Sequence, residues 1–363
     1  MKIGKGIVLI VIGVIILLVI GFFALNRFKE DTAANESQAS KEPGKSIDSL
    51  EKVKIGGIDQ WIDLKGNDDT KPVLLFLHGG PGYGMMPLLH MYNSELESHF
   101  IVVNWDQRGA ALSYSPDIPK SSMTLKQFVA DLHDLTGLLK SRFKQKKIYI
   151  AAHSFGTVIG MKAISKYPND YWAYIGIGQV VDIGENEQQS YDFALESARK
   201  DNNQKAVKAL ESVGRPDNDG NYIDDAGYDI TTKWLEYYGG DLYGKNSTKK
   251  LEDEIYSSEV YSKLGKKANK GVEFSQLLFD DDEVSGLDFR KQLKKVNVPV
   301  YFFSGRHDYD TPFALAQQYY NIINAPKKEF VWFDNSAHFP FYEEPEKFDN
   351  ELISKILPQT YEK

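Results

Sequence analysis

The stretch IAAHSFGTVIG (residues 150–160) decides the fold that we expect. Its first part is an apolar run typical of a buried strand, and the residues after Ser154 are typical of a helix start. A sharp turn between a strand and a helix exposes a serine, and it needs small residues two positions before and after because the two elements approach closely. Ala152 and Gly156 occupy those positions. We therefore predict that Ser154 is a nucleophile on such a turn.

Two later stretches supply the other groups that a serine nucleophile needs. YFFSGRHDYDTP brings Asp308 to the end of one apolar run, and VWFDNSAHFPFYEEP brings His338 to the end of the next. A hydroxyl becomes a useful nucleophile only when a base takes its proton, and a carboxylate must hold that imidazole in the right tautomer. The order Ser, Asp, His belongs to one hydrolase architecture, whose parallel strands bring their carboxyl ends to one edge. We therefore predict a triad of Ser154, His338 and Asp308.

Asp310 is an alternative to Asp308 as the carboxylate of the triad. It lies two residues further on, but the Thr-Pro pair that follows it is typical of a helix start, which Asp310 or Thr311 would cap. His307 is adjacent to Asp308, yet only His338 among the histidines follows the last predicted strand. We expect Asp308 to orient His338.

The stretch LLFLHGGPGYG (residues 74–84) runs a buried strand into a turn rich in glycine. Acyl transfer builds negative charge on a carbonyl oxygen, and backbone N–H groups must come close to stabilise it. Glycine permits this approach because it has no side chain. We expect one donor to be the N–H of Phe155, the residue after the nucleophile, and the other to be that of Gly79 or Gly80.

The composition excludes several classes of protein. The 363 residues are 42% hydrophobic and 26% charged, as in ordinary folded proteins. The net charge of -8 argues against nucleic-acid binding, which needs clustered lysine and arginine. The absence of cysteine excludes disulfides, thiolate zinc sites and iron–sulfur clusters. Residues 216–229 (PDNDGNYIDDAGYD) are rich in acids, but their spacing does not fit a calcium loop, so we expect a turn there and no metal.

The N-terminus predicts a membrane anchor. Residues 7–25 contain no charged or polar side chain, and Lys2, Lys5, Arg27 and Lys29 flank them. A helix of this length crosses a hydrocarbon core of about 30 Å at about 1.5 Å per residue. A cleaved signal peptide and a buried core helix are the alternatives, but the segment is longer than a signal core and no small-residue cleavage site follows at once. We expect a single-pass protein in the cell membrane with its domain outside, although the flanking charges nearly balance.

The rest of the chain divides into a linker and one domain. After the anchor (residues 1–25), residues 26–48 are polar, show no apolar periodicity and predict a flexible tether. In residues 49–363, apolar runs alternate with amphipathic helices, which is typical of a mostly parallel sheet covered on both faces. Residues 183–295 interrupt this alternation with polar helical segments and many aromatics. We expect them to form a helical cap inserted between two strands.

Together these features resemble the α/β-hydrolase superfamily. The pair HGGPG (residues 78–82) and WDQRGAALS (residues 105–113) is similar to the proline iminopeptidase-like branch, peptidase family S33, although Ala111 stands where that family has a second glycine. The resemblance covers residues 49–358. It implies an α/β fold with an eight-stranded, mostly parallel sheet under a helical cap, no cofactor, and hydrolysis at Ser154 through an acyl-enzyme.

An enzyme that releases an N-terminal residue needs acids in the cap to bind the free ammonium group. Members of the family carry a W-x-x-W-E-type segment for this purpose, and the nearest match here is WLEYYGG, with Trp234 at its start and Tyr238 where the acid would fall. Glu236 is shifted by two residues, which on a helix turns it to another side. Glu185, Glu187 and Glu273 are further candidates, each also consistent with a solvated cap residue.

We expect a membrane-anchored serine hydrolase that acts on small peptides or amino-acid amides with a prolyl or hydrophobic N-terminal residue. A carboxylesterase or lipase-like hydrolase of small or lipid-like esters is the alternative, because an aromatic-rich cap suits either acyl group. A non-catalytic surface binding module would usually lack a triad residue, and a relative with an aspartate nucleophile would not carry Ser154. The expected partner is therefore a small molecule or short peptide, with no nucleic acid.

Overall fold

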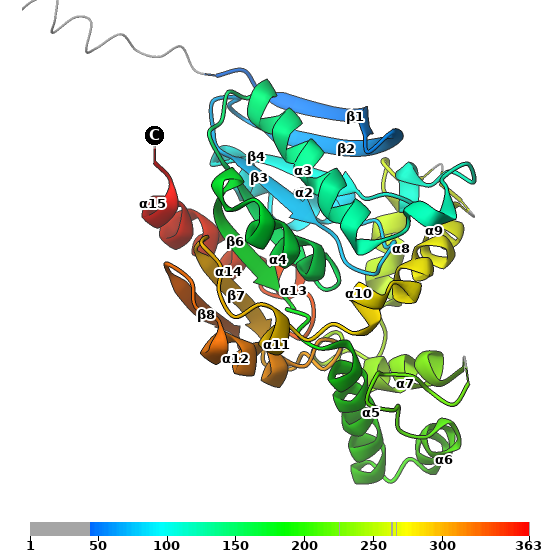
Figure 1. The fold of residues 1–363 in the computed structure, drawn as a ribbon. Helices are drawn as coiled ribbons and strands as arrows, with labels where there is room; N and C mark the ends of the chain where they lie inside the picture. The colour runs from blue at the N-terminus through cyan, green and yellow to red at the C-terminus, as the bar shows by residue number, and fades with distance from the viewer. Residues whose placement is uncertain (1–43, 225, 263, 266, 363) are drawn as a thin grey trace, which may run out of the picture. The chain divides into compact units, whose positions relative to one another are not determined.

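Eight strands of the described chain form one sheet, in the order β1-β2-β4-β3-β5-β6-β7-β8. The computed structural model describes residues 44–362 except 225, 263 and 266, and the compact unit that holds the sheet begins at Lys45 (Figure 1). β1 pairs antiparallel with β2 and β2 with β4, whereas all other neighbours are parallel, which confirms the predicted sheet. The strands are β1 (Ile47–Ile55), β2 (Ile58–Gly66), β3 (Val73–Leu77), β4 (Ile101–Asp106), β5 (Ile148–His153), β6 (Tyr171–Ile177), β7 (Val300–Gly305) and β8 (Lys328–Phe333).

The inner and outer strands have different sequence patterns. All five residues of β3 are buried, and successive side chains alternate between the faces, so that Leu75 and Phe76 join different hydrophobic clusters. The edge strand β1 instead alternates between exposed and half-buried side chains. Because β1 begins at Ile47, the last two residues of the linker predicted for residues 26–48 belong to the sheet.

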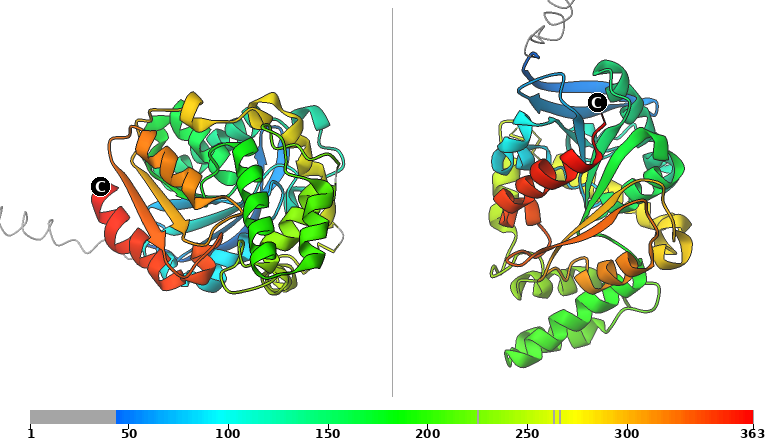
Figure 2. Two further views of the ribbon diagram at one scale, coloured as in Figure 1. Left: turned by 90° about the horizontal axis from the view of Figure 1, so that it is seen from below. Right: turned by 90° about the vertical axis from the view of Figure 1, so that its left-hand side faces the viewer.

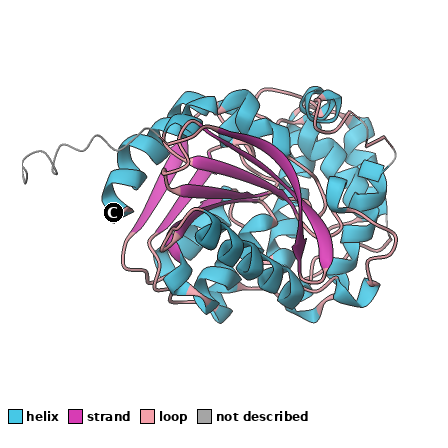
Figure 3. Cartoon of the chain, turned by 90° about the horizontal axis from the view of Figure 1, so that it is seen from above, coloured by secondary structure: helices cyan, strands magenta, loops and turns pink. Residues whose placement is uncertain are grey.

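Helices cover both faces of the sheet (Figures 2 and 3). The apolar sides predicted for two of them are buried, through Phe128, Leu132, Leu135 and Leu139 on one and Phe348, Leu352 and Ile356 on the other. One face carries α3 (Leu125–Arg142), α4 (Gly156–Lys166) and α12 (Phe313–Ile322). The other carries α2 (Met86–Tyr92), α13 (Pro340–Glu343), α14 (Pro345–Asn350), the π-helical η6 (Glu351–Ile356) and α15 (Leu357–Thr360). Short 3-10 helices are η1 (Ser94–Ser98), η2 (Ala111–Ser113), η3 (Lys120–Ser122) and η4 (Pro168–Asp170).

A set of helices, here called the cap, lies between β6 and β7 in the chain. The first three pack around a separate apolar core that includes Tyr191, Leu210 and Trp234. Figure 1 shows them together at one end of the sheet, toward which β6 and β7 point. The cap comprises α5 (Ile183–Lys200), α6 (Gln204–Val213), α7 (Ala226–Tyr237), α8 (Lys249–Ser257), α9 (Lys267–Ser275), η5 (Gln276–Asp280), α10 (Asp282–Ser285) and α11 (Phe289–Gln292).

The acid-rich segment 216–229 contains the turn that its sequence predicts. The side chain of Asp217 accepts the backbone N–H groups of Asp219 and Asn221, both at 2.9 Å. The N–H of Gly220 donates to the Asp217 carbonyl at 3.1 Å. The Asp217 carboxylate is thus engaged by its own turn.

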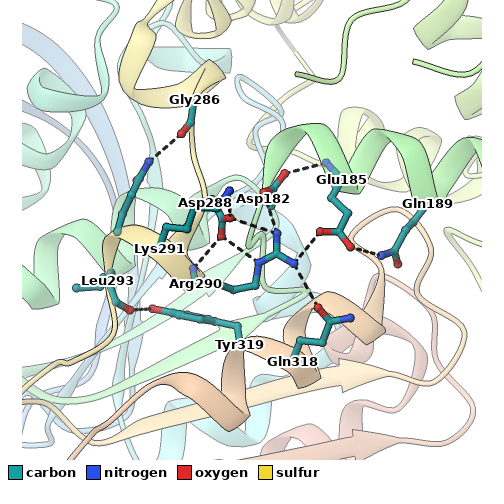
Figure 4. A network of polar contacts seen from close by, with 11 residues as sticks. Asp182, Glu185, Gln189, Gly286, Asp288, Arg290, Lys291, Leu293, Gln318 and Tyr319 are labelled. Atoms are coloured by element: carbon teal, nitrogen blue, oxygen red, sulfur yellow. Dashed lines mark hydrogen bonds and ion pairs between the residues drawn. The ribbon is translucent and has the colours of Figure 1, made fainter. Parts of the chain in front are cut away.

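The two chain crossings between sheet and cap are joined by an ionic cluster, here called the base clamp (Figure 4). Arg290 reaches Asp182 at 2.9 Å, Glu185 at 2.7 Å and Asp288 at 3.0 Å, and Lys291 adds a contact of 2.9 Å to Asp288. Asp182 precedes α5 and Asp288 precedes α11, and the two residues also form an antiparallel bridge. The clamp therefore ties the start of α5, the first helix of the cap, to the start of α11, its last helix.

The membrane anchor predicted for residues 7–25 lies outside the described residues. Among the residues that the structure does describe, none of the helices is both long and apolar enough to span a bilayer.

Candidate active site

Ser154 lies on the sharp turn between β5 and α4. Its backbone is left-handed, with φ +54°, and its side chain is 8% exposed. The helix begins close behind it, because a Cβ on Gly156 would lie only 2.7 Å from the carbonyl oxygens of Leu77 and His78. The N–H of Ser154 donates to the Ile177 carbonyl at 2.9 Å. This arrangement places Ser154 at the carboxyl end of the parallel strands.

The glycine turn after β3 lies directly against Ser154. A Cβ on Gly79 would lie 2.6 Å from Ser154 Cβ and 3.1 Å from Ser154 Oγ, so only glycine fits. His78 Nδ1 donates to the Gly79 carbonyl at 2.8 Å and His78 Nε2 accepts the Gln107 N–H at 3.1 Å, and burial lowers the pKa of His78 to about 4. The neutral ring fixes the direction of the Gly79 carbonyl. Because the peptide bond is planar, the N–H of Gly80 then points away from the His78 ring. The HGGPG and DQRG motifs thus form one unit.

Asp308, in the loop after β7, contacts the imidazole of His338, in the loop after β8. The distance from His338 Nδ1 to Asp308 Oδ2 is 3.1 Å, and both side chains are buried. Thr311 donates its N–H to Asp308 Oδ1 and its hydroxyl to Asp308 Oδ2, both at 2.9 Å. The prediction that Asp310 or Thr311 caps the N-terminus of the following helix is therefore wrong. That helix, α12, starts after Pro312 with no side-chain hydrogen bond at its N-terminus, and Thr311 instead orients Asp308.

Asp310 contacts the other nitrogen of the same imidazole. Its Oδ2 lies 3.1 Å from His338 Nε2, and its side chain is 33% exposed. Burial alone would lower the pKa of His338, but the charges of Asp308 and Asp310 raise it to about 10. The two carboxylates that the sequence offers as alternatives therefore both reach His338, one at each ring nitrogen.

The cap holds both triad loops through its backbone. The N–H of His338 donates to the Asp241 carbonyl at 3.0 Å, and the N–H of Tyr309 donates to the Gly240 carbonyl at 2.9 Å. From the sheet side, His153 Nε2 donates to the His338 carbonyl at 2.9 Å. The cap is thus part of the frame that positions the triad residues.

The charge of Asp310 acts on three carboxyl groups of the cap, and we call these four residues the acid cluster: Glu187, Glu236, Asp241 and Asp310. Burial raises the pKa of Glu187 to about 8, and the charge of Asp310 adds to this shift. Burial also raises the pKa of Glu236 and of Asp241, again with a contribution from Asp310. The negative charge of Asp310 therefore disfavours ionisation of all three cap acids.

The remaining predicted cap residues do not join this cluster. Trp234 is buried in the apolar core of the cap. α7 ends at Tyr237, so Tyr238 leaves the helix, stacks on Trp234 and donates to Asp201 at 3.5 Å. Glu236 is the acid of this segment whose pKa the charge of Asp310 helps to raise, and it accepts a hydrogen bond from the Thr248 hydroxyl at 3.2 Å.

Glu273 is exposed on α9, and Glu185 pairs with Arg290 in the base clamp. Asp241 and the role of Thr311 are not predicted from the sequence. The pair of glycines before Asp241 was the available signal, because a backbone that approaches another chain segment closely favours glycine.

The fold and the site define an α/β hydrolase with a helical cap. The family model described as "Serine aminopeptidase, S33" matches residues 69–211. A probable aminopeptidase of Bacillus subtilis, YbaC, is 32% identical over 310 residues, which cover 85% of this chain and 96% of that protein. The chain belongs to the S33 serine aminopeptidase family.

Other relatives agree with this membership. A proline iminopeptidase of Heyndrickxia coagulans is 23% identical over 81% of this chain and 93% of its own length. Among solved structures, the proline iminopeptidase of Mycobacterium smegmatis matches with a TM-score of 0.61 and 16% identity, covering 86% of this chain and 99% of that one. VinJ matches with a TM-score of 0.63 and 18% identity over 88% of this chain and 100% of its own. The two structures share the fold.

Proposed function

We propose that this hydrolase is an aminopeptidase that acts through an acyl-enzyme on Ser154. His338 takes the hydroxyl proton as Ser154 attacks the scissile carbonyl and then gives it to the leaving amine, while Asp308 holds Nδ1. The N–H groups of Phe155 and of Gly79 or Gly80 stabilise the oxyanion. Water then releases the acyl group by the same route in reverse. The contact between Asp308 and His338 and the close approach of Gly79 to Ser154 support this assignment.

The observation that carries the substrate class is the uncompensated acid cluster. Within the described part of the chain, no lysine or arginine forms an ion pair with Glu187, Glu236, Asp241 or Asp310, and His338 is the single cation that touches any of them. Carboxyl groups whose pKa is raised by a neighbouring negative charge are stabilised in their ionised form by a cation. A free N-terminal ammonium beside the scissile bond supplies one. We therefore propose small peptides or amino-acid amides with a prolyl or hydrophobic N-terminal residue as substrates.

The location of the enzyme is a separate part of the proposal. The apolar segment 7–25 and the polar segment 26–48 support a single N-terminal anchor that holds the catalytic domain outside the cell membrane. Deletion of residues 1–30 should give protein in the soluble fraction. A deleted protein that stays in the membrane fraction would contradict this anchor.

A paired assay of the full-length chain tests the substrate class. Prolyl and alanyl arylamides are compared with p-nitrophenyl acetate and butyrate, and Ser154→Ala serves as the blank. We expect a far higher kcat/KM for the arylamides. Turnover of the esters alone would mean that the enzyme is an esterase.

A further inference from the structure

His338 is held by carboxylates at both ring nitrogens. Asp308 Oδ2 lies 3.1 Å from Nδ1, and Asp310 Oδ2 lies 3.1 Å from Nε2. A ring that donates from both nitrogens is an imidazolium. Such a ring cannot accept the Ser154 proton, because its Nε2 already carries one. In this arrangement the base of the proposed mechanism is occupied.

The surroundings of Asp310 favour its transfer to another cation. Its side chain is partly exposed, whereas that of Asp308 is fully buried and fixed by Thr311. Its backbone carbonyl accepts from Asn186 Nδ2 of α5 at 2.8 Å, which anchors the loop but leaves the carboxylate free to turn. A cation that binds the acid cluster competes directly with His338 for this carboxylate.

The charged groups that face His338 and Asp310 come from several elements. Asp308 and Asp310 lie after β7, Asp241 lies in the cap, and His153 lies on β5. Glu187 of α5 and Glu236 of α7 face Asp310, and Glu343 of α13 faces Asp308. Apart from the two histidines these groups are acids, so an arriving ammonium lowers the negative potential that keeps His338 protonated.

We propose that Asp310 is a specificity gate: its carboxylate holds Nε2 of His338 in the free enzyme and moves to the ammonium of the substrate, which frees Nε2 to act as the base. The inference rests on the proposed aminopeptidase function. As Asp310 leaves, the Nε2 proton passes to water, and the neutral imidazole keeps its Nδ1 proton on Asp308. Ser154 can then give its proton to Nε2. A substrate without an ammonium group leaves Asp310 in place and reacts slowly.

Asp310→Asn in the full-length chain tests this gate. Alanine p-nitroanilide carries the ammonium, p-nitrophenyl acetate lacks it, and a fluorophosphonate reports the reactivity of Ser154 without any substrate. We expect kcat/KM for the anilide to fall at least about tenfold, and ester turnover and labelling near pH 7 to rise about three- to tenfold, because the base is free more often. Asp334→Asn removes a charge from an exposed side chain that pairs with Arg306. This control should leave the turnover of both substrates and the rate of labelling unchanged.

The pH profile gives a readout that a purely structural role would not move. In Asp310→Asn the acid limb of the labelling rate should move to lower pH, because one carboxylate no longer stabilises the imidazolium. A parallel change in anilide and ester turnover, or an unmoved acid limb, would overturn the gate.

The wild type offers a test that needs no substitution. Its acid limb in kcat for the anilide, which reports the bound state, should lie at least about one pH unit below the acid limb of labelling, which reports the free enzyme. If the acid limb of kcat and the acid limb of labelling fall at the same pH, the gate is also overturned. Failure of the proposed function looks different: the wild type would not hydrolyse the anilide at all, whereas the labelling profiles of wild type and Asp310→Asn would still decide whether Asp310 holds the base.

Discussion

The base clamp and the acid cluster are both groups of carboxylates, but they differ in how their charge is balanced. In the base clamp, Asp182, Glu185 and Asp288 share Arg290 and Lys291. Burial would raise the pKa of Asp288, but hydrogen bonds from Arg290 and Lys291 lower it to about 2. The carboxylates of the clamp have the cations that they need.

In the acid cluster the pKa values of all four carboxyl groups are raised, whereas in the clamp burial and the charge of Asp288 raise the pKa of Asp182 alone. Burial and the charge of Asp310 raise the pKa of Glu187 to about 8. His338 is the cation within reach, and it is also the base that the chemistry requires. Acids that are compensated inside the protein serve stability, whereas acids left uncompensated beside a nucleophile favour a bound cation. The difference between the clamp and the cluster is therefore the main reason to expect an amine substrate.

The largest effect is expected at the nucleophile beside the acid cluster. Ser154→Ala should lower kcat by at least about 10⁴-fold with no loss of folded protein, because the hydroxyl forms the acyl-enzyme. Steady-state rates and circular dichroism check this. Ser304→Ala, on β7, two strands away from β5, changes a buried serine whose hydroxyl has no partner among the described residues, and it should keep its activity. Equal rates for Ser154→Ala and wild type would remove Ser154 from the mechanism.

The next effect separates the two carboxylates that touch His338. Asp308→Asn should lower kcat for amides and esters alike by about 10³-fold, because an amide at Nδ1 no longer stabilises the imidazolium that forms as Ser154 attacks. Asp310→Asn should slow amides only. If ester turnover survives in Asp308→Asn and is lost in Asp310→Asn, the roles of the two residues are exchanged.

Breaking the base clamp should reduce stability rather than chemistry. Arg290→Met leaves three partly buried carboxylates with one exposed lysine, and we expect the free energy of unfolding to fall by about 2 kcal/mol at neutral pH. Urea unfolding measures it. Arg215→Met is the control, because Arg215 pairs with Asp192 at the exposed surface of the cap and should cost less than about 1 kcal/mol.

The stability difference between wild type and Arg290→Met should also depend on pH. The folded pKa of Asp288 is about 2, below its ordinary value of 3.8, so its ion pairs stabilise the fold above 3.8 and lose this effect as the pH falls toward 2. The stability difference between wild type and Arg290→Met should shrink over that range. A difference that is the same at neutral pH and near pH 2 would mean that the clamp is not electrostatic.

The smallest effect is expected within the acid cluster. Glu187→Gln replaces a carboxyl group that a bound ammonium would hold in its ionised form, and it should raise KM for free-amine substrates about tenfold, with little change for esters. Glu273→Gln makes the same change at an exposed position of α9 and should have no effect. Similar values for the two variants would remove Glu187 from the binding site.

The parts of the fold that the sequence predicts are those with strong local patterns. The buried strands appear as apolar runs, as in β3, and the helix face of Phe128 and Leu132 appears at helical spacing. β1 gives no such run, because an antiparallel edge strand buries only one side of its residues, and its start at Ile47 was therefore missed. A local sequence pattern is therefore enough to predict a strand when both of its faces are buried.

The site is predictable only in part for the same reason. The turn at Ser154 and the order of the triad are local signals. The position of Asp241 and the contact between Asp310 and His338 depend on how the cap meets the sheet, which no local pattern contains. The comparison of Glu236 with position 238 assumes one continuous helix, but α7 ends at Tyr237 and Tyr238 lies beyond it.

The most direct test of the account compares alanine p-nitroanilide with its N-acetylated form on the full-length enzyme. The two differ at the amino group, which is the ammonium that the acid cluster is proposed to bind in one and a neutral acetamide in the other. The account predicts that acetylation lowers kcat/KM at least about 100-fold, which corresponds to about 2.7 kcal/mol of transition-state stabilisation. Equal kcat/KM values for the two anilides would contradict it, because the uncompensated acids would then play no part in choosing the substrate.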